Sequence, residues 1–123
     1  MNKIHSALAF FFFIALLSFG QKKELIWEEA FNGTTLNEDV WNFELGDGCP
    51  ELCGWGNNER QRYTTTNHNL QNGYLHIQAK LEDGRYTSTR ITTKDKFEFQ
   101  YGKIEARAKL PVGKGLWPAF WML

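Results

Sequence analysis

Apolar and polar residues alternate along two stretches of the chain, residues 74–81 and 103–110. The apolar positions of these stretches are Leu75, Ile77, Ala79 and Leu81 in the first, and Ile104, Ala106, Ala108 and Leu110 in the second. A period of two places apolar side chains on one face of a strand and polar side chains on the other. We therefore predict a half-buried strand in each stretch.

Turn signals separate these strands from their neighbours. Asn72-Gly73 precedes the first stretch and suits a tight turn with positive backbone angles. Glu-Asp-Gly at residues 82–84 follows it, and residues 85–93 are rich in the Tyr, Thr and Ile that favour strands. No part of residues 21–123 shows helical periodicity over three turns. The pattern predicts an all-β sandwich with short connections.

A third apolar run, residues 116–123, also has the character of a strand. A buried strand needs a partner on each edge, and the predicted strands are few for that purpose. Sandwiches of this kind are normally longer. We therefore expect the sandwich to be incomplete in this chain, which is then a fragment.

An apolar leader occupies residues 1–20. It combines a basic start, an apolar run shorter than the roughly 20 residues of a bilayer span, and the small residue Gly20 before a polar onset at Gln21. These features predict a secretory signal peptide, with the domain in residues 21–123. We expect a secreted or periplasmic protein with no stable membrane insertion; the alternative is an uncleaved anchor.

Charge and composition narrow the choice of partner. The 14 Lys and Arg residues balance the 14 Asp and Glu residues, and 15% of the chain is aromatic. Proteins that bind nucleic acid usually carry a basic stripe, so the balance argues against such a partner. The aromatic content argues against disorder.

Cys49 and Cys53 lie in a short glycine-bracketed stretch, residues 48–54. Two cysteines cannot supply the four ligands of a structural zinc site. In an exported protein they favour a disulfide that closes a surface loop. A pair of unlinked thiols is the alternative, because a short loop constrains the geometry of the bond.

Residues 55–63 mix amides, charges and aromatic rings beside this loop. Such a mixture suits sugar recognition, since aromatic faces meet sugar C–H surfaces while amides and guanidinium groups bind hydroxyls. Trp117 and Trp121 are separated by an even number of positions, so on a strand both side chains project from the same face. That face lines either a cleft or the core. Arg90 lies within a Thr-rich strand, where surface exposure is the alternative to a functional role.

The sequence shows no residue pair or motif that would indicate catalysis. Glu28 and Glu29 are adjacent, so on a strand they point to opposite faces and cannot flank one glycosidic bond. Glu82-Asp83 belong to a turn. The chain has no Gly-x-Ser-x-Gly, phosphate-binding glycine loop or His-Glu-x-x-His motif. From the residues alone we predict sugar binding, with no catalytic and no metal-ligating residue.

Five motifs follow one another along the chain: Trp27 with Phe-Asn-Gly at 31–33, Trp-Asn at 41–42, Cys-Pro-Glu-Leu-Cys-Gly-Trp-Gly-Asn-Asn-Glu at 49–59, Tyr-Gly-Lys-Ile-Glu-Ala-Arg at 101–107, and Gly-Leu-Trp-Pro-Ala-Phe-Trp-Met-Leu at 115–123. In this order they resemble glycoside hydrolase family 16, most of all its laminarinase-type endo-1,3-β-glucanases. The resemblance implies a concanavalin-like β-jelly-roll sandwich with an open polysaccharide cleft. It also implies retaining hydrolysis of a β-1,3-glucan such as laminarin by two glutamates.

In the family, those glutamates belong to a Glu-x-Asp-x-x-Glu segment that follows the Trp-Pro-Ala-Phe-Trp-Met-Leu strand. Residues 1–123 do not contain this segment. No residue here inherits a catalytic role, and we expect the chain to be inactive alone.

Four binding residues do carry over from the resemblance. Asn57 matches the family's cleft asparagine, Arg90 matches an arginine that binds sugar hydroxyls, and Trp117 and Trp121 match the aromatic pair of the cleft floor. No cofactor is required. Many members hold a structural calcium ion, but Ala30 stands where an acidic residue is frequent and cannot supply a carboxylate. Glu29 and backbone carbonyls are the alternative ligands.

Two other functions fit the same residues. One is a non-catalytic carbohydrate-binding sandwich that kept the cleft and lost the carboxylates. The other is a structural cell-surface domain in which Trp117 and Trp121 are core residues and Asn57 closes a turn.

Overall fold

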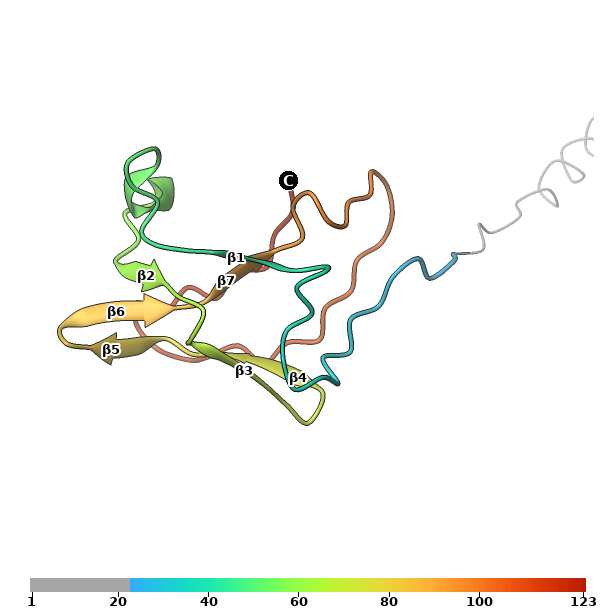
Figure 1. The fold of residues 1–123 in the computed structure, drawn as a ribbon, viewed down its shortest axis with the longest axis horizontal. Helices are drawn as coiled ribbons and strands as arrows, with labels where there is room; N and C mark the ends of the chain where they lie inside the picture. The colour runs from blue at the N-terminus through green and yellow to red at the C-terminus, as the bar shows by residue number, and fades with distance from the viewer. Residues whose placement is uncertain (1–22) are drawn as a thin grey trace, which may run out of the picture.

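The computed structural model describes residues 23–123, so the signal peptide predicted at residues 1–20 lies outside the described residues. Within residues 23–123, no helix is long and apolar enough to cross a membrane. The described chain consists of short strands, one 3-10 turn and long extended connections (Figure 1).

Seven strands form three small sheets (Figure 1). In chain order, the elements are β1 (Asn42–Glu44), η1 (Cys53–Gly56), β2 (Gln61–Tyr63), β3 (His68–Gln71), β4 (Tyr74–Ile77), β5 (Lys80–Glu82), β6 (Arg85–Ser88) and β7 (Arg90–Thr92). Strands β1 and β7 pair antiparallel, β3 and β4 form a hairpin, and β6 lies between β2 and β5. The β2–β6 pair is parallel and the β5–β6 pair is antiparallel.

Both hairpins turn where the sequence predicts a turn. Asn72 and Gly73 have φ of 54° and 73° between β3 and β4. Asp83 and Gly84 have φ of 49° and 75° between β5 and β6. Two successive positive φ angles are the mark of a type I′ turn, whose twist matches that of the flanking strands. The predicted turns are confirmed.

The single strand predicted over residues 74–81 is divided in two. The chain leaves its pairing with β3 after Ile77, and Gln78 N–H donates instead to the carbonyl oxygen of Asn67, at 2.8 Å. It then pairs with β6 as β5. Ile77 and Leu81 are 49% and 61% exposed, so within the described chain the alternating apolar face is not buried.

The strands predicted at residues 103–110 and 116–123 do not form within the described chain. Both segments lack ladder pairing, and the C-terminal part of the ribbon carries no arrow (Figure 1). Strand geometry is stabilised by hydrogen bonds to a neighbouring strand. Neither segment pairs with an edge of the three sheets within residues 23–123, so the pattern alone does not produce a strand.

Aromatic rings from distant segments form the main apolar cluster. The Trp27 ring lies 5.0 Å from that of Phe97 and 5.8 Å from that of Trp41, measured between centroids. Phe31 stacks on Trp41 at 6.2 Å. These contacts tie the segment before β1 to the segment after β7, which lie at the same end of the antiparallel pair, and so hold the pair at the Asn42–Thr92 end.

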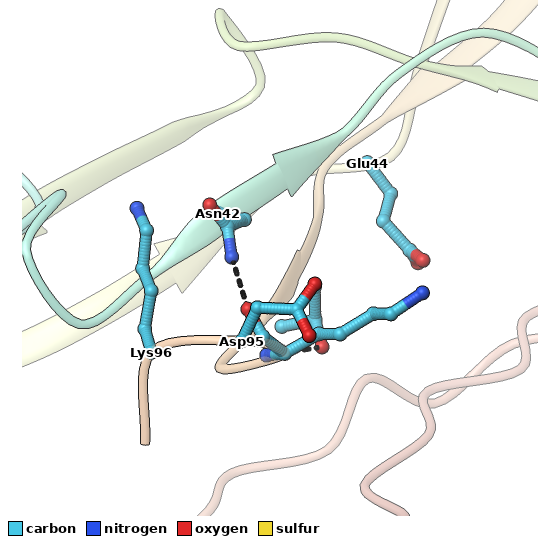
Figure 2. Close-up of a pocket in the computed structure, with 6 residues that line it drawn as sticks. Asn42, Glu44, Asp95 and Lys96 are labelled. Atoms are coloured by element: carbon cyan, nitrogen blue, oxygen red, sulfur yellow. Dashed lines mark hydrogen bonds between the residues drawn. The ribbon is translucent and has the colours of Figure 1, made fainter. Parts of the chain in front are cut away.

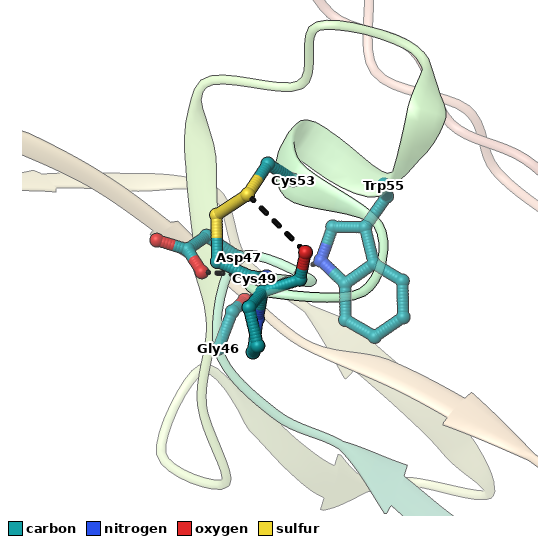
Figure 3. The surroundings of a disulfide bond; sticks show 6 residues. Gly46, Asp47, Cys49, Cys53 and Trp55 are labelled. Atoms are coloured by element: carbon teal, nitrogen blue, oxygen red, sulfur yellow. Dashed lines mark hydrogen bonds between the residues drawn. A yellow bond between two sulfur atoms is a disulfide. The ribbon is translucent and has the colours of Figure 1, made fainter.

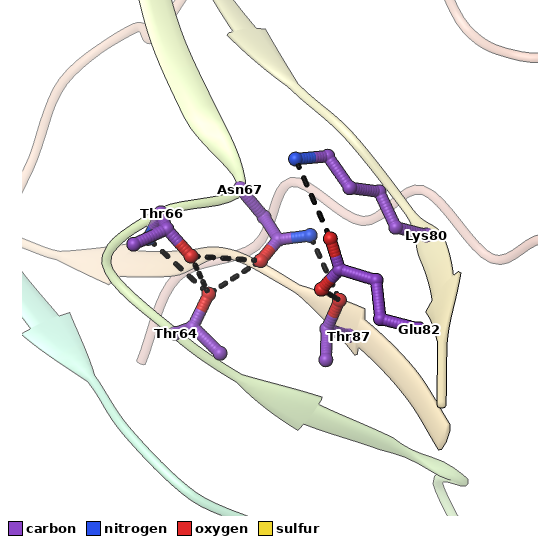
Figure 4. A network of polar contacts seen from close by, with 6 residues as sticks. All are labelled: Thr64, Thr66, Asn67, Lys80, Glu82 and Thr87. Carbon is purple, nitrogen blue, oxygen red and sulfur yellow. Dashed lines mark hydrogen bonds and ion pairs between the residues drawn. The ribbon is translucent and has the colours of Figure 1, made fainter. Parts of the chain in front are cut away.

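A polar node joins the hairpin of β3 to the sheet of β6 (Figure 4). The Asn67 side chain, at 0% exposure, accepts a hydrogen bond from the Thr64 hydroxyl and donates one to Thr87 Oγ1 at 2.9 Å. The Thr87 hydroxyl in turn donates to Glu82 at 3.0 Å. A buried amide satisfied in this way fixes the relative position of the strands that it bridges.

Replacing Asn67 with alanine is expected to lower the free energy of unfolding by about 1–3 kcal/mol, because the change removes buried hydrogen bonds and leaves a void. The matched control is Asn69→Ala at an exposed position of β3, where we expect a change within about 0.5 kcal/mol. Denaturant titration of both variants measures the difference. Equal losses would show that the node contributes nothing specific.

Candidate sugar-binding site

Arg90, the first residue of β7, lies among three aromatic rings. Its guanidinium carbon is 4.5 Å from the centroid of Trp55, 5.1 Å from that of Trp121 and 5.8 Å from that of Tyr63. A cation within about 6 Å of an aromatic face is attracted by the ring quadrupole. Only 19% of the Arg90 side chain is exposed, so the rings hold the guanidinium in one place.

Glu44 supplies the counter-charge for this arginine. In the β1–β7 register Glu44 lies directly opposite Arg90, so the two side chains share one face of the strand pair. Arg90 Nε forms an ion pair with Glu44 Oε2, and the Glu44 side chain is 28% exposed. A partly buried guanidinium is tolerated because this carboxylate offsets its charge.

The loop of residues 46–56 carries Trp55 (Figure 3), whose ring lies 4.5 Å from the guanidinium carbon of Arg90. A disulfide joins Cys49 to Cys53 and closes the loop. Asp47 holds both sides of it, since its carboxylate accepts from Cys49 N–H at 3.1 Å and its carbonyl accepts from Gly54 N–H at 2.8 Å. The indole N–H of Trp55 points to the carbonyl of Gly46, at 3.4 Å.

Asn57 joins the same site through a chain of hydrogen bonds. Its amide donates to Glu59 Oε1 at 3.3 Å, and Glu59 Oε2 accepts from the Tyr63 hydroxyl at 2.7 Å. Gln61 Nε2 lies 2.8 Å from both Glu59 Oε2 and the Tyr63 oxygen. Glu59, Gln61 and Tyr63 alternate along the chain, so one face of β2 presents all three. Tyr63 connects this chain of bonds to Arg90.

Burial and the hydrogen bond to Glu59 raise the pKa of Tyr63 from 10.0 to about 12. The raised pKa means that the folded protein retains the phenolic proton more tightly than the unfolded chain. The resulting stabilisation is complete below pH about 10 and is lost as the pH rises to about 12.

We expect Glu59→Gln to lower the pKa of Tyr63, because it removes both the anionic acceptor and its charge. Glu51→Gln, at an exposed position in the same loop, should leave that pKa unchanged. Ultraviolet titration of tyrosinate absorbance measures it, with the Tyr63→Phe variant identifying the signal. An unchanged titration in Glu59→Gln would contradict the arrangement.

A polar pocket continues the site along the β1–β7 pair (Figure 2). Its cavity volume is about 320 Å³, and its lining residues are Asn42, Glu44, Thr92, Lys94, Asp95 and Lys96. Asn42 and Thr92 are opposite each other in the same register as Glu44 and Arg90, two positions away. All four side chains therefore share one face of the strand pair, and the pocket adjoins the Arg90 cluster.

Of the four binding residues inferred from the sequence, the structure brings Arg90 and Trp121 into contact, and Asn57 is linked to them only through Glu59 and Tyr63. Trp117 is 85% exposed and makes no ring or cation contact with the cluster in the described chain. Residues 116–123 do not form a strand, so the expectation that Trp117 and Trp121 project from the same strand face does not apply.

Sequence reasoning missed Glu44, and it included Glu59 and Tyr63 only as members of the mixed stretch of residues 55–63, with no individual role. Glu59 and Tyr63 carry a signal that could have been used, namely their alternation with Gln61 beside the cysteine loop. Glu44 carries no local signal, because its role depends on the pairing of β1 with β7.

Glu29, the acidic residue beside Ala30, is held by hydrogen bonds within the described chain. The Glu29 carboxylate accepts hydrogen bonds from Phe31 N–H at 2.8 Å and from Trp41 Nε1–H at 3.2 Å, so both oxygens are engaged. Ala30 has no carboxylate. Between residues 23 and 123, no three His, Cys, Asp or Glu side chains lie close enough together to hold a metal ion.

The chain is similar in sequence to proteins whose names refer to 1,3-β-glucan. It is 44% identical over 114 residues to glucan endo-1,3-beta-glucosidase A1 of Niallia circulans, covering 80% of this chain and 17% of that protein. A beta-1,3-glucan-binding protein of Penaeus monodon is 57% identical over 37 residues, or 30% of this chain and 10% of that protein. The chain thus spans well under half of the length of either relative.

The laminarinase of Flavobacterium sp. UMI-01 superposes with a TM-score of 0.62 at 66% identity, covering 64% of this chain and 34% of that structure. This match confirms the predicted all-β jelly-roll class, of which the described residues form a part. Residues 56–123 match the family described as glycosyl hydrolases family 16. The chain therefore belongs to glycosyl hydrolase family 16.

Proposed function

We propose that the protein is a secreted, retaining glycoside hydrolase that cleaves a β-1,3-glucan such as laminarin. Membership of family 16 supports the reaction class. The names of the relatives from Niallia circulans and Flavobacterium support the glucan. In this proposal, residues 23–123 supply part of the sugar-binding surface.

The observation that carries the proposal is the arrangement around Arg90. Its Nε atom is paired with Glu44, and no partner for its terminal nitrogens occurs within residues 23–123. Those nitrogens can donate to sugar hydroxyls, while Trp55 and Trp121 offer apolar ring faces beside them. An uncharged polysaccharide needs this combination of fixed donors and flat apolar surface.

Retaining hydrolysis requires two carboxyl groups about 5–5.5 Å apart, one as nucleophile and one as acid and base. The Glu-x-Asp-x-x-Glu segment that supplies them in the family does not occur in residues 1–123. The proposal therefore assigns binding and positioning to this chain's residues. Glu44 positions Arg90, and Glu59 positions Asn57 and Tyr63.

A second candidate is a carbohydrate-binding protein without hydrolytic activity. The observation that favours it is the similarity to the beta-1,3-glucan-binding protein of Penaeus monodon. The Arg90 cluster suits both candidates equally, because recognition of the glucan precedes its cleavage.

Incubation of the full-length protein with laminarin separates the two candidates. Release of reducing ends, with the β-anomer as the first product seen by NMR, supports a retaining hydrolase. Retardation in a laminarin-containing gel without release of reducing ends would support the binding protein. Neither hydrolysis nor retardation would reject both.

Secretion is the remaining part of the proposal, and it rests on the leader at residues 1–20 and on the disulfide between Cys49 and Cys53. Disulfides persist in oxidising compartments. Sequencing the N-terminus of the exported protein tests the cleavage. We expect it to begin near Gln21, and a retained Met1 would contradict the proposal.

A further inference from the structure

Three arginines meet at a hollow on the other side of β2, where β2 and β6 begin. Its lining residues are Asp47, Arg60, Gln61, Arg62, Gly84, Arg85 and Tyr86, and its cavity volume is about 510 Å³. Small-molecule sites fall within about 300–1,000 Å³. We call it the arginine hollow.

The parallel pairing of β2 with β6 brings the arginines together. Gln61 pairs with Tyr86 and Arg62 with Thr87, so continuing the register by one residue puts Arg60 beside Arg85. Neighbouring strands lie about 4.8 Å apart, and like charges directly opposite each other are destabilising. Arg60 and Arg85 therefore repel each other across this pair, while Glu82 lies opposite Arg85 on the other neighbouring strand, β5.

The three arginines form no ion pair among the described residues, since the carboxylate of Glu82, opposite Arg85, accepts from Thr87 and lies 3.9 Å from Lys80 Nζ. Within residues 23–123, no ion pair or side-chain hydrogen bond engages Arg60, Arg62 or Arg85, whereas Arg90 is paired with Glu44. Asp47 is the one carboxylate of the lining, and its Oδ1 accepts from Cys49 N–H. The guanidinium groups are thus free to donate to an added oxyanion.

The arginine hollow is distinct from the Arg90 cluster. Arg60 and Arg62 alternate along the chain with Glu59, Gln61 and Tyr63, whose side chains bond to one another. Of these three residues, Gln61 alone also lines the hollow. A ligand in the hollow therefore does not need to occupy the Arg90 site.

We propose that the arginine hollow binds an acidic group of a charged glycan, with the sulfate or carboxylate held by the arginines and a sugar ring against Tyr86. Tyr86 supports a sugar rather than a bare ion, because its ring is 49% exposed at the wall of the hollow and aromatic faces pack against sugar C–H surfaces. The site would attach the protein to an acidic polysaccharide while the Arg90 cluster remains open to a neutral glucan.

Affinity electrophoresis of the full-length protein tests the proposal with iota-carrageenan as the sulfated probe, alginate as the carboxylated probe and pullulan as the neutral one. Retardation by either acidic probe and not by pullulan is expected, and it should weaken as salt is added. Arg60→Gln/Arg62→Gln and Arg85→Gln should each raise the apparent Kd by about tenfold or more. The matched control for charge is Lys109→Gln/Lys114→Gln, at exposed positions away from the hollow.

The outcomes separate the sources of the anion. Binding of carrageenan alone identifies sulfate, binding of alginate alone identifies carboxylate, and binding of both supports a general acidic glycan site. No retardation by either probe, or equal losses in the arginine and lysine variants, would overturn the proposal. Equally tight, arginine-dependent binding of single-stranded DNA would also overturn it, because the site would then recognise polyanions in general.

Discussion

Replacing Arg90 with alanine in the full-length protein is expected to lower kcat/KM on laminarin by about 10- to 100-fold. A hydrogen bond from a charged donor is worth about 1.5–3 kcal/mol, which corresponds to that range. The variant also leaves Glu44 as a partly buried carboxylate without its partner, and the rings of Trp55 and Trp121 lose the cation between them. Reducing-sugar kinetics and laminarin affinity measure the effect.

Arg107→Ala is the matched control, since Arg107 also lies over an aromatic ring, that of Tyr74 at 5.7 Å, away from the cluster. It should leave laminarin hydrolysis within about twofold of the parent. Arg90→Lys should recover only part of the activity, because an ammonium group cannot pair with Glu44 and donate to hydroxyls in the planar geometry of guanidinium. Wild-type kinetics in Arg90→Ala would remove the site from the proposed mechanism.

The local features of the fold could be predicted from the sequence. The turns at Asn72-Gly73 and Asp83-Gly84 need positive φ angles, which short-range chemistry alone demands. The class of the fold follows from the same signals, because alternation, turn residues and the lack of helical periodicity all favour strands. The comparison with the Flavobacterium laminarinase confirms that class.

The pairing of strands that are distant along the chain could not be predicted from the sequence. The ion pair between Glu44 and Arg90 depends on the pairing of β1 with β7. The parallel pairing of β2 with β6 joins strands that are separated in the sequence by β3, β4 and β5. Alternation tells which side chains share a face and leaves open which strand lies beside it. The sequence therefore identified Arg90 as a candidate by its residue type, but it did not identify Glu44 as the partner of Arg90.

The segments at residues 103–110 and 116–123 also show that a local pattern does not specify the pairing partner of a strand. Their patterns have the period of a strand, yet without a paired edge in the described chain they remain extended and exposed. Trp121 nevertheless reaches Arg90. Its place in the site depends on the path of the backbone rather than on strand parity.

Gly48→Ala is expected to have the largest effect on stability, at about 3 kcal/mol or more, together with a loss of laminarin affinity. Gly48 has φ of +82°, and a Cβ atom there would lie 2.1 Å from the carbonyl oxygen of Leu52. Leu52 N–H also donates to the Gly48 carbonyl, at 2.7 Å. The loop that carries Trp55 must therefore move away, which takes the ring from Arg90.

Gly46→Ala isolates the steric part of this effect, because Gly46 has a nearly equal φ of +86° and nothing within 4 Å of its Cβ position. That control carries only the cost of a left-handed alanine, about 1–2 kcal/mol. Thermal unfolding and tryptophan fluorescence of the two variants measure stability and the position of Trp55. Equal losses in both would mean that the contact between Gly48 and Leu52 does not set the loop, and that Trp55 is held over Arg90 by the disulfide and the Asp47 hydrogen bonds instead.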